Sequence, residues 1–167
     1  MRILGVDPGL TRTGWALVVA DGHAYRLLGA GVVAPPPKGE LATRLAEGYR
    51  RFTLVLEECR PDLIVMEDVF TAPRYPQAAL KMAHLRGVLC LAAALAKVDV
   101  VSLTATTVKR RLTGNGHASK EQVQRMVFEL CEVRAGKMPS DLSDAVALAI
   151  AGLHQASSLP HSLAAAR

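Results

Sequence analysis

The chain has 167 residues and a mass of 17.8 kDa, about the size of one domain, and 20 Lys and Arg outweigh 15 Asp and Glu to give a net charge of +5. Its longest apolar runs, at residues 88–96 and 145–153, have about half of the roughly 18 residues that a membrane span needs, and no secretory signal opens the chain, so we expect a soluble cytoplasmic protein. The odd number and wide spacing of Cys59, Cys90 and Cys131 exclude a disulfide framework and a cysteine-based zinc site.

The first third of the chain predicts three antiparallel strands followed by a long helix. Residues 2–6 form an apolar run that ends in an Asp-Pro-Gly turn, which is typical of a strand and a turn. Residues 13–19 and 25–33 read as two further strands, joined by the hairpin signal Asp-Gly. Beyond a proline-rich loop, apolar residues recur every three or four positions over residues 41–59, the spacing of one face of an amphipathic helix.

The rest of the chain alternates buried strands with helices. We expect strands at residues 63–66 and 98–103, and helices at residues 77–97, 104–112, 119–131 and 141–155. Residues 113–118 form a glycine-bearing loop, and Ser119 with Gln122 predicts a capping box at the start of the helix that follows. This order indicates an α/β domain over residues 1–155, with a mixed sheet covered by helices, and a poorly ordered tail over residues 156–167.

Two acidic residues stand at equivalent places in the predicted sheet. Asp7 and Glu67 are each the first charged residue after an apolar strand. Taken singly, each fits an ordinary turn or strand-end residue about as well as a functional one. If the two strands are neighbours, both carboxylates emerge at the edge of the sheet where open α/β sheets collect their ligands.

The last predicted helix carries two more acids on one face. Residues 145–153 are apolar all round, so this helix must be buried in the domain. Asp141 and Asp144 are three positions apart and point the same way from its first turn. A favourable interaction with the helix dipole explains Asp141 well. It explains Asp144 poorly, because a charge on a buried helix needs a partner or a metal ion.

Four carboxylates from three distant segments are the hard oxygen ligands that Mg²⁺ or Mn²⁺ selects. Setting them aside leaves 11 acids against 20 basic residues, a charge of +9 on the rest of the protein. An acidic cluster within a basic protein is unexpected for simple DNA binding. It is what two-metal hydrolysis of a DNA phosphodiester requires.

The sequence resembles the RuvC family of Holliday junction resolvases, endonucleases of the ribonuclease H-like fold. The matching motifs run in family order from residue 3 to about residue 152. They comprise Ile3-Leu4-Gly5-Val6-Asp7-Pro8-Gly9, Thr13-Gly14, Glu67-Asp68-Val69-Phe70, Ala79-Leu80-Lys81, Arg86-Gly87, Val108-Lys109, Gly114-Asn115-Gly116-His117-Ala118, Lys120 and Asp141-Leu142-Ser143-Asp144-Ala145. The set is specific, although Asp-Pro-Gly alone is a weak signal.

This resemblance implies roles for particular residues and partners. The family's catalytic and metal-binding acids correspond to Asp7, Glu67, Asp141 and Asp144, with two Mg²⁺ or Mn²⁺ ions in each active site. Its DNA-binding residues correspond to Lys109, Lys120 and the base-stacking aromatic Phe70. The resemblance further implies a homodimer that makes paired nicks in a four-way junction, and a branch-migration helicase as partner. Tyr75 and Leu85 depart from the family's pattern beside the helix that its members use to dimerise.

The residues themselves leave other interpretations open. A related nuclease could act on other branched DNA or on structured RNA. The first strand with Asp7, Gly9, Thr11 and Thr13 also resembles the phosphate loop of sugar-kinase or chaperone-like ATP-binding domains. Those ATPases need two domains, however, and the chain supplies about one. A pure DNA-binding module would leave the carboxylates unexplained. The basic run 109–111 also fits a solvated face, and the loop at residues 113–118 fits either a phosphate-binding turn or an ordinary helix start.

Overall fold

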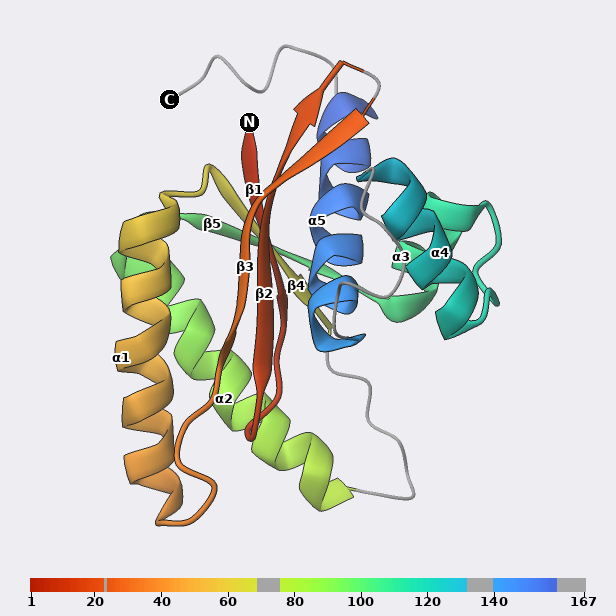
Figure 1. The fold of residues 1–167 in the computed structure, drawn as a ribbon. Coiled ribbons are helices and arrows are strands. Elements are labelled where there is room, and N and C mark those ends of the chain that lie inside the picture. Colours follow the sequence, from red (N-terminus) through yellow and green to blue (C-terminus); the bar gives the residue numbers. More distant parts are fainter. Residues whose placement is uncertain (23, 69–75, 132–139, 159–167) are drawn as a thin grey trace.

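The computed structural model describes residues 1–22, 24–68, 76–131 and 140–158, and it describes the side chains of these residues except at 76–78, 81, 140–141 and 156–158. Strands and helices follow one another in the order that the sequence predicts (Figure 1). Their bounds are β1 Arg2–Asp7, β2 Thr13–Asp21, β3 Ala24–Val33, α1 Leu41–Cys59, β4 Leu63–Glu67, α2 Pro76–Leu95, β5 Asp99–Leu103, α3 Ala105–Thr113, α4 Lys120–Leu130 and α5 Ser140–Ser158.

The five strands form one mixed sheet in the order β3-β2-β1-β4-β5. The pairs β1–β2 and β2–β3 are antiparallel, whereas β1–β4 and β4–β5 are parallel. The predicted arrangement of three antiparallel strands followed by parallel ones is therefore confirmed. In the central pair, Val6 of β1 lies opposite Met66 of β4, so the two strands end side by side.

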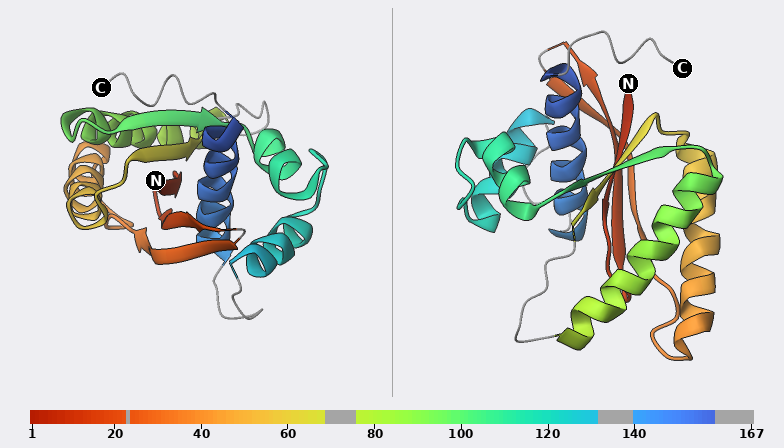
Figure 2. Two further views of the ribbon diagram at one scale, coloured as in Figure 1. Left: turned by 90° about the horizontal axis from the view of Figure 1, so that it is seen from above. Right: turned by 180° about the vertical axis from the view of Figure 1, so that it is seen from behind.

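Helices cover both faces of the sheet, as predicted (Figures 1 and 2). Because side chains alternate along a strand, neighbouring residues of β1 enter different layers. Leu4 and Val6 belong to the cluster that α1 and α2 cover, whereas Ile3 belongs to the cluster around α5. Val65 of β4 lies in the α5 layer with Ile3. By the same alternation, Asp7 and Glu67 belong to the α5 side of the sheet.

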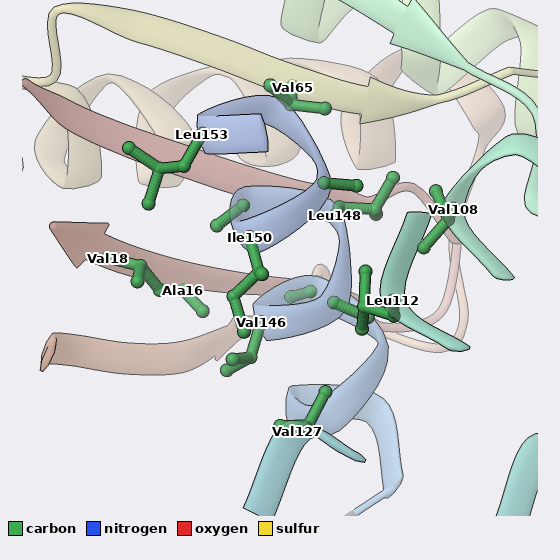
Figure 3. Close-up of a cluster of buried hydrophobic side chains, with 14 of the residues drawn as sticks. Ala16, Val18, Val65, Val108, Leu112, Val127, Val146, Leu148, Ile150 and Leu153 are labelled. Carbon is green, nitrogen blue, oxygen red and sulfur yellow. The ribbon is translucent and has the colours of Figure 1, made fainter. Parts of the chain in front are cut away.

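Helix α5 is the centre of its layer and is buried from Ala145 to Leu153, as its apolar sequence predicts. Figure 3 shows its side chains between the strands of the sheet and α3. The helix lies unusually close to β1. A Cβ atom at Gly5 would be 2.0 Å from the main-chain O of Ala145 and 2.7 Å from the main-chain N of Ala149. Small residues on both elements therefore set the spacing between α5 and the sheet.

The structure differs from the prediction in three places. Strand β5 begins at Asp99 and is buried only at Leu103, because it is the edge strand and one side of it has no neighbour in the sheet. Helix α2 ends at Leu95, two residues before Lys97, which has a left-handed φ of 58°. Helix α5 continues to Ser158, past the predicted end at residue 155. The remainder of the predicted tail, residues 159–167, lies outside the described part of the chain.

The three cysteines lie at or beside the core. All three cysteines are free, with Cys59 buried and Cys90 and Cys131 half-buried against the two core clusters. Burial raises the pKa of the Cys131 thiol to about 11, as expected for a core thiol. No helix in the described ranges combines the length and the apolar character needed to cross a bilayer.

Candidate active site

Two acidic residues meet where β1 and β4 end. Asp7 and Glu67 are the last residues of neighbouring parallel strands, directly after the paired residues Val6 and Met66. Both are half-buried, and their side chains share a hydrogen bond in which protonated Asp7 donates to Glu67. The expectation that the two strands are neighbours and bring these carboxylates together is confirmed.

Asp144 joins them from the first turns of α5. It precedes Ala145, the residue that lies against Gly5 of β1, and so the close approach of helix and strand brings it beside the end of the sheet. Its Oδ2 atom accepts a hydrogen bond of 2.7 Å from Nζ of Lys120, at the start of α4. The main chain of Asp141 lies one turn earlier in the same helix, and its side chain is outside the described residues.

The electrostatics of the site reflect the crowding of its carboxylates. Burial, the charges of Glu67 and Asp144 and the hydrogen bond to Glu67 raise the pKa of Asp7 to about 7, and Lys120 opposes this shift. Burial also raises the pKa of Glu67, together with Asp144, against the lowering effects of Asp7 and Lys120. Without a further cation, this edge of the sheet therefore binds a proton more tightly than ordinary carboxylates do.

A cleft of about 220 Å³ opens beside these acids. Glu67 and Asp144 line it together with Lys109 of α3 and Lys120 of α4. Its remaining walls come from the core between the helices, at Ala105, Val108, Val123, Ala147 and Leu148. Both lysines that the resemblance identifies therefore face the acids, while Phe70 lies outside the described residues.

The basic run at residues 109–111 is not simply a solvated face. Lys109 lines the cleft and Arg110 is exposed. Arg111 turns inward, where its Nη1 atom donates hydrogen bonds of 3.0 Å to the main-chain O of Ala151 and to Oε1 of Gln155. It thereby ties α3, which carries Lys109, to α5.

The loop before α4 is an ordinary helix start. Within it, the main-chain N–H groups of Gly114, Asn115, His117 and Ala118 donate to Arg110, Thr113 and Asn115. These groups are therefore already used, which argues against the phosphate-binding turn. The predicted capping box is confirmed, since Ser119 and Gln122 exchange side-chain to main-chain hydrogen bonds.

Several residues that support the site were not identified from the sequence. Thr13 is fully buried, and its Oγ1 atom bonds both the N and the O of Gly9, which closes the turn after Asp7. Arg44 of α1 donates to the O of Leu10 in the same turn. The only sequence signal for Thr13 was its position in a matching motif, and nothing local pointed to Arg44.

The donor set fits a hard divalent cation by its chemistry. Its described members, Asp7, Glu67 and Asp144, offer only carboxylate oxygens, and they are crowded enough to hold a proton. Among the residues with described side chains, no group of three His, Cys, Asp or Glu is arranged as a ligand set. Lys120 forms an ion pair with Asp144. The side chain of Asp141 is not among the described ones and is not counted in this set.

Comparison with known proteins matches this chain to one family. The family described as crossover junction endodeoxyribonuclease RuvC matches residues 3–152. The protein of that name from Methylorubrum populi is 43% identical over 150 residues, which cover 90% of this chain and 78% of the relative. The one from Bordetella avium is 40% identical over 154 residues, covering 92% and 84%. These matches favour the endonuclease over an ATP-binding domain or a pure DNA-binding module.

Solved structures agree with the sequence relatives. Thermus thermophilus RuvC has a TM-score of 0.86 at 32% identity, covering 94% of this chain and 96% of that one. The structure of the same protein in complex with a Holliday junction substrate also has a TM-score of 0.86 at 32% identity, and the match covers 93% of this chain and 94% of that one. The predicted ribonuclease H-like fold is thereby confirmed. This chain therefore belongs to the RuvC family of crossover junction endodeoxyribonucleases, hydrolases that cut the phosphodiester bonds of DNA at Holliday junctions in recombination and repair.

Proposed function

We propose that Asp7, Glu67, Asp141 and Asp144 hold two divalent ions, Mg²⁺ or Mn²⁺, and that this enzyme uses them to resolve four-way DNA junctions. The observation that carries the proposal is the meeting of carboxylates from β1, β4 and α5, where burial and the charges of Glu67 and Asp144 raise the pKa of Asp7 to about 7. In phosphodiester hydrolysis, a bound pair of such ions lowers the pKa of the attacking water and stabilises the leaving 3′ oxygen, leaving a 5′-phosphate.

The residues around the acids have distinct tasks in this proposal. Asp7 and Glu67 must give up the proton they share before both can act as ligands, because metal ligands have to be deprotonated. Lys120 compensates the charge of Asp144 at 2.7 Å, and its exposed side chain can also contact a DNA phosphate at the cleft. Lys109 lines the same cleft and can contact a DNA phosphate there.

We expect Lys109→Ala and Lys120→Ala each to lower junction cleavage about 10- to 100-fold, the loss of one charged hydrogen bond to the substrate. Metal binding should persist in both variants, because neither lysine is a ligand. If a variant also loses junction affinity, the slope of log K against log salt should shrink by about 0.9 for each phosphate contact removed. Measurements of cleavage rate and of junction affinity at several salt concentrations test this.

Lys97→Ala is the matched control, because Lys97 is an exposed lysine near the start of β5, at the opposite end of the sheet. Its cleavage rate and salt slope should equal those of the unmodified enzyme. Unchanged activity and salt dependence in Lys109→Ala and Lys120→Ala would show that both residues belong to the ordinary solvated surface.

The outer face of α2 fits a second copy of this chain as its partner. Leu80, Leu91 and Leu95 expose 61%, 55% and 64% of their surface along this helix, with His84 and Gly87 between them at helical spacing. A Cβ atom at Gly87 would meet no atom of the described residues within 4 Å, so no contact among those residues requires this mid-helix glycine. The close approach of a helix from a second copy would require a glycine here.

The departure from the family's pattern at residue 85 leaves this exposed face unchanged. Leu85 is fully buried, and its Cδ1 atom lies where a Cβ atom at Gly48 of α1 would come within 2.8 Å. It therefore belongs to the contact between α1 and α2 inside the subunit. Tyr75, the other departure, lies outside the described residues.

Gly87→Leu should convert the enzyme to a monomer that still folds, because the new side chain has open space in the subunit but would separate two paired helices. The helix itself should gain stability, since glycine costs a helix interior about 1 kcal/mol relative to good helix formers. Coordinated paired incision should be lost. Sedimentation and a nicking assay on a supercoiled plasmid carrying a cruciform test both effects.

The control Ala46→Leu adds the same side chain to an exposed position of α1 and should leave the dimer intact. The dimer proposal would be wrong if Gly87→Leu remained dimeric, or if a monomer still made coordinated paired cuts.

Three further assignments rest on the family resemblance. We assign Phe70 to stacking on a base at the opened crossover, a contact worth about 1 to 3 kcal/mol. The family's branch-migration helicase is the expected partner complex, and the cytoplasm is the expected compartment.

The direct test compares a synthetic four-way junction with a linear duplex of the same sequence, with and without Mg²⁺ or Mn²⁺ and without ATP. We expect symmetric nicks in the junction alone, and only with the divalent ion. Cleavage of duplex at the same rate, or a requirement for ATP, would contradict the proposal. Binding to the junction without any nicking under all conditions would favour a DNA-binding module.

A further inference from the structure

Arg86 lies in the middle of α2 and reaches across to the end of β4. Its Nε atom donates a hydrogen bond of 3.2 Å to the main-chain O of Glu67. Its Nη2 atom donates to Oγ of Ser102 on β5 and lies 3.7 Å from Oδ1 of Asp68. One guanidinium thus joins α2 to the last residue of β4, to the residue after it and to β5.

The end of β4 is paired with β5, where the main-chain N of Asp68 donates a hydrogen bond of 2.9 Å to the O of Leu103. The pairing of β4 with β1 extends to Met66, opposite Val6, whereas Glu67 is paired with Leu103 of β5. Glu67 is thus held by a sheet neighbour on the β5 side, and Arg86 holds its carbonyl from α2. Because β5 is the edge strand, this support comes from the less enclosed side of the sheet.

Arg86 contacts Glu67 at its main-chain O, by the hydrogen bond from Nε. Its contact is with the main chain, while the carboxylate belongs to the α5 side of the sheet. Arg86 itself is 21% exposed, so most of its side chain is committed to contacts within the subunit.

We propose that Arg86 is a positioning residue, which sets the direction of the Glu67 carboxylate by holding the main-chain carbonyl of the same residue. This inference rests on the proposed role of Glu67 as a metal ligand. Groups that orient a metal ligand typically affect metal affinity or activity by about 10- to 100-fold when they are removed. Displacement of a catalytic group by about 1 Å has effects of a similar size.

The experiment compares Arg86→Met, which keeps the apolar stem and removes the donors, with Arg86→Lys, which keeps the charge and one donor group. The control is Arg51→Met. Arg51 also donates to a main-chain carbonyl, that of Ala34 at 3.0 Å, and pairs with a carboxylate, that of Glu47, but it lies on α1 away from the acids. The measurements are single-turnover cleavage at saturating enzyme, junction affinity without metal, Mn²⁺ binding by calorimetry and the melting temperature.

For Arg86→Met we expect a cleavage rate about 10- to 100-fold lower and Mn²⁺ binding about tenfold weaker. Junction affinity should stay within about threefold, because the partners of Arg86 in the described part of the chain, Glu67, Asp68 and Ser102, are not among the proposed DNA-binding residues. Arg86→Lys should retain part of the cleavage rate and part of the Mn²⁺ affinity that Arg86→Met loses. Arg51→Met should have the rate and Mn²⁺ affinity of the unmodified enzyme, with a similar fall in melting temperature to Arg86→Met.

The inference is overturned if Arg86→Met cleaves junctions and binds Mn²⁺ as Arg51→Met does. If Arg86→Met does not fold, the inference is overturned by a folded Arg86→Lys whose cleavage rate and Mn²⁺ affinity are unchanged. Glu67→Gln separates this failure from failure of the proposed function. An active Glu67→Gln would refute the metal site itself. An inactive Glu67→Gln beside a fully active Arg86→Met would refute only the positioning role.

Discussion

Asp7→Asn is expected to abolish junction cleavage while junction binding stays intact or becomes slightly tighter. The change keeps the shape of the side chain and removes one of the four charges proposed to hold two divalent cations, so catalysis should be lost with metal occupancy. The affinity for the junction without metal should change in the opposite direction and stay equal or rise. Fewer anions at the sheet edge repel the DNA phosphates less, while the remainder of the protein, at +9, still attracts them.

The fold should tolerate this substitution, and the pKa of Asp7 explains why. Because folding raises this pKa from 3.8 to about 7, the folded protein binds the proton more tightly than the unfolded chain does. Asp7 therefore costs stability progressively as pH rises from about 4 to about 7. Asn cannot ionise, so without metal Asp7→Asn should melt at or above the temperature of the unmodified protein at pH 8, with a smaller difference near pH 5.

Cleavage of junctions, gel-shift affinity without metal and melting curves at both pH values measure these effects. Asp21→Asn is the matched control, because Asp21 is likewise the last residue of a strand but is exposed in the hairpin after β2. It should leave cleavage unchanged. A folded Asp7→Asn that cuts junctions at nearly the normal rate with Mg²⁺ or Mn²⁺ would disprove the role of the acidic site.

Gly5→Ala should have the largest effect on stability among the changes considered. The added Cβ atom would lie 2.0 Å from the main-chain O of Ala145 and 2.7 Å from the main-chain N of Ala149, and neither is a flexible side chain that can turn aside. Helix α5 must move away from β1. We expect a loss of about 3 kcal/mol or more, at the upper end of overpacking costs. For a chain of this size that lowers the melting temperature by about 6 to 12 °C.

The same displacement should lower cleavage beyond the loss of folded protein, because α5 carries Asp144 to the site beside Asp7. Cleavage should therefore be measured well below the melting temperature of the variant. Gly29→Ala is the control, since a Cβ atom at Gly29 would meet Trp15 at an ordinary 3.6 Å, and it should change stability by less than about 1 kcal/mol. Equal behaviour of the two variants would contradict the tight contact between α5 and β1.

The positions of the carboxylates were predictable from the sequence because they depend on local patterns and on one rule of topology. Apolar runs ending in Asp7 and Glu67 mark strand ends, and parallel neighbours present those ends at one edge of the sheet. The apolar run after Asp144 required a buried helix, which had to bring its first turn into the domain. Periodicity and charge thus sufficed for the fold class and for the acidic residues.

Which residues support these acids was decided by tertiary contacts that no local pattern encodes. Arg86 and Arg111 are ordinary helical arginines in the sequence, yet each donates to a main-chain carbonyl far along the chain, at Glu67 and Ala151. The loop at 113–118 resembled a phosphate-binding turn until its N–H groups were found to bond within the loop and to the end of α3.

Burial of β5 was overestimated for the same reason. A run of apolar residues predicts a strand, but whether that strand is central or at the edge depends on what pairs beside it. Likewise, Gly5 looks like any small residue in a strand, and its presence is explained by the main-chain O of Ala145, which lies 2.0 Å from where a Cβ atom would be. The sequence by itself determined the order of the elements and the strand ends and helix turn at which Asp7, Glu67 and Asp144 lie. The tertiary structure alone determined how those groups are held, because contacts between distant segments depend on packing distances that local sequence does not contain.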